Sequence, residues 1–164
     1  MFSGTGDAYW INVEDPASVV GDADYVFVAK VVSQGDAEYD GQVTLETSTG
    51  TSTIAAPFTN YTILVQQNLK GSLLTNDSVP VQISGGFSRE LNTTVTPDDT
   101  MLPEVGRSYV FNAIAQPDGS LLVQGGNSVV PVDDGYAVVD SYVEAVKNQI
   151  PTPRERFSSK FEQD

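Results

Sequence analysis

The chain has 164 residues, which is enough for one domain and too few for two. Apolar residues make up 40% and charged residues 18% of it, a globular rather than a disordered composition. Cysteine and histidine are both absent, so the sequence excludes disulfides, thiolate nucleophiles, Cys/His zinc sites and Ser-His-Asp triads. No stretch approaches the roughly 18 to 20 unbroken apolar residues that span a membrane.

The formal net charge of −14 predicts that nucleic acid and anionic membrane surfaces are not partners, because both would be repelled. Such acidity favours solubility, or life at high salt or low pH, or else attraction to cations or to a basic partner. Residues 1–146 carry 19 acidic and 4 basic side chains, whereas four of the eight basic residues lie in the last 18 positions. We therefore expect residues 151–164 to form a solvated polar tail.

Residues 1–12 have the composition of a polar leader and lack the basic and apolar regions of a signal peptide. The absence of cysteine and the abundance of Thr, Ser and Val suit a surface protein of a Gram-positive bacterium. We expect an exported or cell-surface protein whose export signal lies upstream, with a single domain over residues 13–150.

The first elements are a short helix and a buried strand. Within residues 15–21, Asp15 can accept the first backbone N–H groups, Pro16 fits the first turn, and Gly21 allows a left-handed exit. Residues 25–32 are apolar on nearly both faces, which predicts a strand covered on both sides.

Residues 33–60 are interpreted as an excursion that carries a small surface hairpin. The pairs at 35–36 and 40–41 each combine Gly with Asp and predict turns. The Thr/Ser-rich run around residues 48–50 predicts the end of the hairpin.

Apolar positions alternate with polar ones in the segments that follow, which predicts strands at residues 61–69, 79–83, 109–115 and 121–123. Pro80 favours an edge position for the second of these, because proline has no N–H to donate. Residues 117–119, Pro-Asp-Gly, predict the tight turn of a hairpin between the last two. The long loop over residues 85–106 is of a kind that is usually functional.

The end of the domain predicts an extended segment at residues 129–132 and then a helix. Ser141 and Glu144 form a capping box, and Pro151 stops the helix. One helical face is apolar and consists of Val139, Tyr142, Val143, Val146 and Ile150. Together the elements predict an all-β, five-stranded OB-like barrel with a short N-terminal helix, an inserted hairpin and a C-terminal helix. A β-sandwich is the alternative, because the number of strands does not distinguish the two.

Three segments also resemble one family. Residues 23–31, Ala-Asp-Tyr-Val-Phe-Val-Ala-Lys-Val, resemble the opening strand of the tissue-inhibitor-of-metalloprotease-like, or netrin-like, OB-fold family. Residues 61–72, which end in Leu-Lys-Gly-Ser, are similar to its second strand, and residues 106–111, Gly-Arg-Ser-Tyr-Val-Phe, to the start of its fourth. The order and spacing agree over residues 15–126.

This resemblance implies an OB fold and an extracytoplasmic setting. It does not imply metalloprotease inhibition, because the animal inhibitors chelate zinc through an N-terminal cysteine and this chain has none. Fold analogy alone is a poor guide to function.

A calcium site is the one metal site that the sequence suggests. Asp36, Glu38 and Asp40 occupy alternate positions before Gly41, as hard oxygen ligands do in calcium loops. The pattern is incomplete, because Thr47 stands where an EF-hand needs a bidentate Glu. A plain solvated turn is the competing interpretation.

Phe87 and Arg89 are the predicted partner-binding residues, because an apolar ring lies there in a polar loop. No residue is predicted to be catalytic, and no cofactor other than calcium is considered. We expect a non-catalytic exported or cell-surface binding module that recognises a protein or a cell-envelope polymer through residues 33–60 and 85–106. The alternatives are a small carboxylate-dependent hydrolase and a purely structural surface domain.

Overall fold

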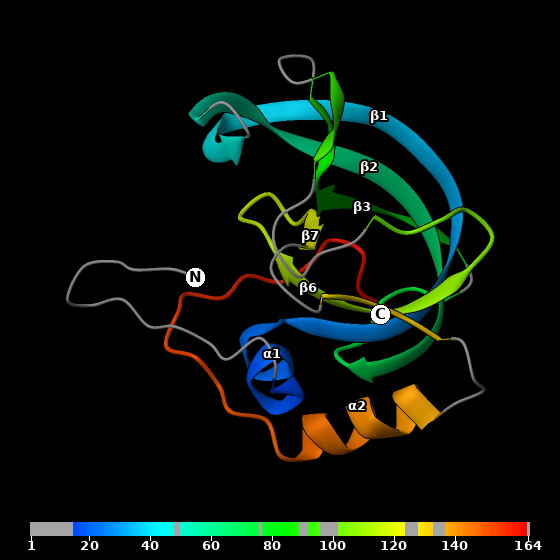
Figure 1. Ribbon diagram of the computed structural model, residues 1–164. Helices are drawn as coiled ribbons and strands as arrows, with labels where there is room; N and C mark the ends of the chain where they lie inside the picture. Colours follow the sequence, from blue (N-terminus) through cyan, green and yellow to red (C-terminus); the bar gives the residue numbers. More distant parts are fainter. Residues whose placement is uncertain are drawn as a thin grey trace.

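The computed structural model describes residues 15–47, 50–75, 77–88, 92–95, 102–123, 128–132 and 137–163. For residues 40–47, 51–56 and 87–88 it describes the backbone alone. Within these ranges the elements in chain order are α1 (Pro16–Asp22), β1 (Tyr25–Thr47), β2 (Gly50–Lys70), β3 (Ser78–Ser84), β4 (Gly86–Ser88), β5 (Thr93–Val95), β6 (Ser108–Ala115), β7 (Leu121–Val123), β8 (Val129–Pro131) and α2 (Ala137–Lys147) (Figure 1).

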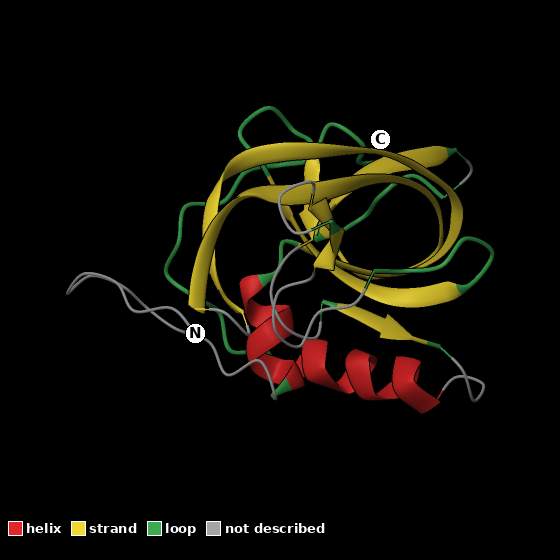
Figure 2. Ribbon diagram, turned by 45° about the horizontal axis from the view of Figure 1, so that its top comes forward, coloured by secondary structure: helices red, strands yellow, loops and turns green. Residues whose placement is uncertain are grey.

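Five strands close a barrel in the order β1-β2-β3-β7-β6, and β6 pairs back to β1. All neighbours are antiparallel except β3 and β7, which are parallel. β8 pairs with the other side of β6 and lies outside the barrel. The strands curve round in a ring, with both helices beneath it (Figure 2). The predicted OB-like barrel is therefore confirmed, and the β-sandwich alternative is wrong because the sheet closes on itself.

The first strand is covered on both faces, as its sequence predicts. Tyr25 and Phe27 point into the barrel, whereas Val26 and Val28 pack against the helices. Phe27 stacks on Phe111 of β6 with ring centroids 5.6 Å apart. The barrel interior is an apolar core that also includes Tyr61, Ile63, Val65, Val79, Val81, Ile83, Tyr109, Leu121 and Val123.

α1 begins as predicted but ends differently. The Asp15 carboxylate accepts a hydrogen bond of 3.1 Å from the Ala17 N–H at the start of the helix. Gly21 lies inside the helix instead of at a left-handed exit. A Cβ at this position would lie 1.9 Å from the Ile150 carbonyl oxygen, so the absence of a side chain lets the chain after α2 pass.

α2 begins earlier than its sequence predicts, at Ala137. The capping-box prediction is wrong, because Ser141 lies within the helix and its hydroxyl donates to the carbonyls of Ala137 and Val138. The apolar face is confirmed in large part, since Val139 and Tyr142 are buried against the outer face of the barrel. Neither described helix combines the length and apolarity that a membrane crossing requires.

The expected inserted hairpin is instead the continuation of two barrel strands. β1 and β2 pair without interruption as far as Thr47 and Gly50, and the predicted turn pairs lie inside β1. Register shifts fall between Gln34 and Ala37 and between Tyr39 and Gln42. The Gly-Asp pairs therefore accompany bulges, which bend a strand without ending it. We call residues 32–57, where this hairpin runs beyond the β1–β6 pairing, the arm.

The other predicted strands are present, but one of them does not have its predicted place in the sheet. β6 and β7 form the predicted hairpin, whose turn is closed by bonds between Gln116 and Ser120 and between Gly119 and Gln116. The edge position predicted for this strand is wrong, because β3 pairs with β2 on one side and with β7 on the other. Pro80 is tolerated there because it lies opposite Thr62, outside the three residues of β3 that pair with β7. Residues expected to form a long loop include the two-stranded hairpin β4–β5.

The C-terminal segment differs most from its prediction. Residues 151–163 run from α2 back to the barrel and do not extend as a solvated tail (Figure 1). The Leu74 N–H donates to the Phe161 carbonyl at 2.9 Å, and Leu73 forms a bridge with Glu162. Ser159 is buried and its N–H donates to the Tyr25 hydroxyl at 2.8 Å. The polar residues of this segment are therefore bonding groups that fasten it to the domain.

Candidate functional site

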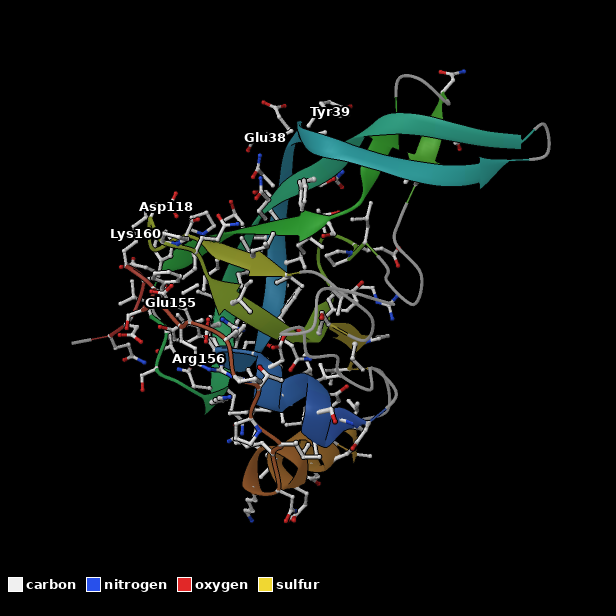
Figure 3. The ribbon with its side chains drawn as sticks, turned by 90° about the vertical axis from the view of Figure 1, so that its left-hand side faces the viewer. Glu38, Tyr39, Asp118, Glu155, Arg156 and Lys160 are labelled. Atoms are coloured by element: carbon white, nitrogen blue, oxygen red, sulfur yellow. The ribbon has the colours of Figure 1, made fainter. Side chains whose placement is uncertain are left out.

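The arm is the part of the molecule that extends furthest from the barrel core. Seen from the side, β1 bends at Glu38 and Tyr39 and the hairpin then runs out beyond the barrel (Figure 3). Val32 is 46% exposed, and residues 33–36 are exposed as well. Residues 25–29 of the same strand are all buried, so this run of exposed residues marks where β1 is no longer covered.

The carboxylates proposed for calcium lie on the arm in an extended strand. The Asn60 side-chain amide donates to the Asp36 carbonyl at 3.0 Å and to the Glu38 carboxylate at 2.6 Å. Asp36 and Glu38 are therefore on a strand and not in the predicted turn, while the side chain of Asp40 lies outside the described residues. Among the side chains that the structure describes, no group of three Asp, Glu, His or Cys residues could hold a metal ion.

The β4–β5 hairpin lies against the base of the arm. The Gly85 N–H donates to the Pro57 carbonyl at 2.9 Å, and the Thr59 hydroxyl donates to the Gly85 carbonyl at 2.8 Å. The two segments expected to carry partner recognition, 33–60 and 85–106, are thus brought together. Phe87 belongs to β4, where it pairs with Thr94, but its side chain and the whole of Arg89 lie outside the described residues.

An apolar pair marks the point where the arm leaves the barrel. The Gly106 N–H donates to the Val31 carbonyl at 2.8 Å, and the exposed residues Val32 and Val105 are the chain neighbours of these two bonded residues. Val105 is 53% exposed. Next to it the Arg107 and Glu104 side chains form an exposed ion pair of 2.9 Å. This spot therefore offers apolar surface within a polar surround.

A second polar cluster lies at the opposite side of the domain, and sequence reasoning missed it. It consists of two carboxylates and three cations, and we call it the latch: Asp22, Asp24, Lys70, Arg154 and Arg156. Both arginines approach one Asp24 oxygen at 3.0 Å, and the Asp24 side chain is only 6% exposed. The other Asp24 oxygen accepts from the Ala115 N–H at 2.9 Å.

Lys70 completes the latch from the end of β2. Its ammonium donates to the carbonyls of Val20 and Ala23 and to the Gln149 side chain, at 2.9, 2.7 and 2.7 Å. All three protons are thereby used, and two of them meet the C-terminal end of α1, where a cation is favoured. Burial, and then the nearby Arg156, lower the pKa of Lys70 from its ordinary value. The latch joins α1, the barrel and the C-terminal segment, so we interpret it as a cluster that stabilises the fold.

The chain matches no protein-family model, and a search of curated proteins found no match.

Proposed function

We propose that this protein is a non-catalytic binding module, exported or held at the cell surface, that recognises a protein or a cell-envelope polymer through the arm. The observation that carries the proposal is the arm itself, a strand pair that continues beyond the β1–β6 pairing and whose residues 32–36 are exposed. OB barrels commonly bind ligands at one face and at two connections, between the first and second barrel strands and between the fourth and fifth. The arm is the first of these connections.

The connection between the fourth and fifth barrel strands also favours the arm as the binding region. It is the turn between β6 and β7, and the C-terminal segment covers it. The Lys160 N–H donates to the Gly119 carbonyl at 3.1 Å, and the Ser159 hydroxyl donates to the same oxygen at 3.2 Å. Asp118 and Lys160 lie side by side there (Figure 3). Because the C-terminal segment covers the turn between β6 and β7, the arm is the connection that a partner could reach.

The non-catalytic character rests on where ionisable groups lie. The described residues buried in the barrel interior are aliphatic or aromatic, with the hydroxyls of Tyr25, Tyr61 and Tyr109 as the ionisable groups among them, and no described Asp, Glu, Lys or Arg residue is buried as a whole. A hydrolase of the carboxylate type needs two carboxyl groups held at a set separation across a substrate. The resemblance to the netrin-like family and the cell-surface setting stay predictions, and they agree with a binding role.

The test uses a variant with a shortened arm. Tyr39 pairs with Pro57, so a two-residue Asn-Gly turn can replace residues 40–56 and leave the pairing of β2 with β3 in place. Wild type and variant are immobilised and exposed to cell-envelope extract of a Gram-positive bacterium. We expect equal circular dichroism spectra, and capture of envelope components by the wild type that the variant largely loses. Equal capture by both would remove the arm from the account, and release of new reducing ends from the extract would favour the hydrolase.

A further inference from the structure

The outer edge of β1, the edge opposite β2, loses its strand partner abruptly. The ladder with β6 ends at the pair of Lys30 with Ser108, and Val31 adds two last bonds, from its N–H to the Arg107 carbonyl at 2.9 Å and from the Gly106 N–H to its carbonyl at 2.8 Å. On the β6 side, the segment that leads into β6 turns away from β1 at Gly106, whose φ of +92° suits a residue without a side chain. From residue 32 to residue 47, β1 pairs only with β2 among the strands that the structure describes.

Such an edge is a template for another strand. A strand with a free edge presents a row of backbone N–H and C=O groups, and extended peptides bind proteins by joining it. A segment that continued the line of β6 would pass the exposed side chains of Val32 and Val105 first. Those two side chains give the incoming segment an apolar contact at the point where pairing would begin.

The charge of the arm determines which kind of peptide segment can pair with its free edge. No Lys or Arg occurs between Lys30 and Lys70, and this stretch contains four carboxylates, at positions 36, 38, 40 and 46. Asp36 and Glu38 are exposed, and neither forms an ion pair with a Lys or Arg that the structure describes. The Asn60 amide holds the Glu38 carboxylate in place without neutralising it. Asp36 and Glu38 therefore carry exposed negative charge beside this edge that the described part of the fold does not compensate.

Resting on the proposed function, we propose that the outer edge of β1 over residues 32–47 binds an extended, basic segment of a partner protein by β-strand addition. Backbone hydrogen bonds supply the affinity, and Lys or Arg side chains of the partner meet the carboxylates and supply the selectivity. A second copy of this chain is the disfavoured occupant, because it would bring the same four carboxylates and a net charge of −14.

The probe is a ten-residue peptide in which Lys alternates with Thr and Val. Its control carries the same number of Lys residues, but proline replaces every second Thr or Val, so that ladder bonds cannot form. Binding is followed by fluorescence polarisation and by hydrogen exchange of the protein's amides. We expect the first peptide to bind and to slow exchange within residues 32–47, and the proline peptide to do neither.

A pair of charge variants tests the carboxylates. Asp36→Asn with Glu38→Gln removes two charges and keeps an oxygen that can accept from Asn60. The matched control, Asp77→Asn with Glu155→Gln, removes two charges from exposed positions, and Glu155 lies well away from Glu38 (Figure 3). Because exposed charge pairs are individually weak, we expect the arm variant to weaken binding about two- to thirty-fold at low salt. The control should change it less than two-fold.

Several results would overturn the inference. Equal binding of both peptides would show attraction by charge alone, without strand addition. Protection of residues 32–47 that grows with protein concentration in the absence of peptide would identify a second copy as the occupant. If the peptide leaves these amides unprotected while the shortened arm still abolishes envelope capture, strand addition is wrong and the proposed function survives.

Discussion

Replacing Asp24 with alanine tests whether the latch stabilises the fold. The Asp24 carboxylate is nearly buried and is shared by Arg154 and Arg156, which are 16% and 32% exposed. Removing one partner of a buried ion pair costs about 3–5 kcal/mol, but here water can reach both arginines afterwards, which lowers this to about 2 kcal/mol. The buried Ala115 N–H also loses its acceptor, at about 1 kcal/mol. The expected loss is therefore about 3 kcal/mol.

The assay is urea unfolding followed by far-ultraviolet circular dichroism, together with a thermal melt. For a chain of this size about 3 kcal/mol corresponds to a fall in Tm of roughly 6–12 °C. Asp77→Ala is the control, because Asp77 is exposed, and it should change stability by less than about 0.5 kcal/mol. If Asp24→Ala proves no more destabilising than this control, the latch does not hold the domain together.

Three further predictions follow from the packing. Gly21→Ala should destabilise the protein although alanine favours helices, because its Cβ would overlap the Ile150 carbonyl; a raised Tm would refute the close contact. Burial raises the pKa values of Tyr25 and Tyr61 to about 12, and for Tyr25 the hydrogen bond to Glu162 adds to the effect. The folded state therefore keeps these two protons at a pH where the unfolded state has lost them. Stability from both tyrosines should thus be complete below about pH 10 and be lost toward pH 12, and tyrosine absorbance at 295 nm that titrates fully near pH 10 in the folded protein would contradict this. Trypsin should cut within residues 151–163 about as slowly as the whole domain unfolds, and rapid release of this segment would show that it is solvated after all.

Local patterns predicted the barrel well because the apolar positions of each strand indicate which of its faces are covered. The strand at 25–32 shows the principle, since apolar residues on both faces implied cover on both sides and the structure provides it from the barrel core and the helices. The Pro-Asp-Gly turn and the Asp15 cap could also be predicted from the sequence, because each depends on residues that are close in sequence.

Patterns failed where distant partners decide the conformation. The glycines at 35 and 41 favour turns locally, but pairing with β2 keeps the chain extended and turns the extra residues into bulges. Ser141 has the spacing of a helix cap, yet the apolar residues before it pack on the barrel and extend the helix backwards. Each is a case of tertiary packing overriding local propensity.

The latch could not be foreseen for a related reason. Arg154 bonds to Asp22 across 132 positions of sequence, and nothing in the sequence near either residue indicates the other. A cluster of basic residues in an acidic chain was the available signal, and its interpretation as a solvated tail overlooked that such residues can neutralise acids within the same fold. For the arm, the corresponding signal was the absence of Lys and Arg between positions 30 and 70.

Hydrogen exchange along β1 in the free protein tests the central claim, that its outer edge is open to a partner. Amides of residues 25–30 lie between β2 and β6 and should all be protected to a degree that approaches the global stability. Beyond residue 31 we predict that protection alternates, with amides that face β2 slow and amides that face the outer edge fast. Uniform protection across residues 32–47 would show that the edge is already occupied, and would contradict the account.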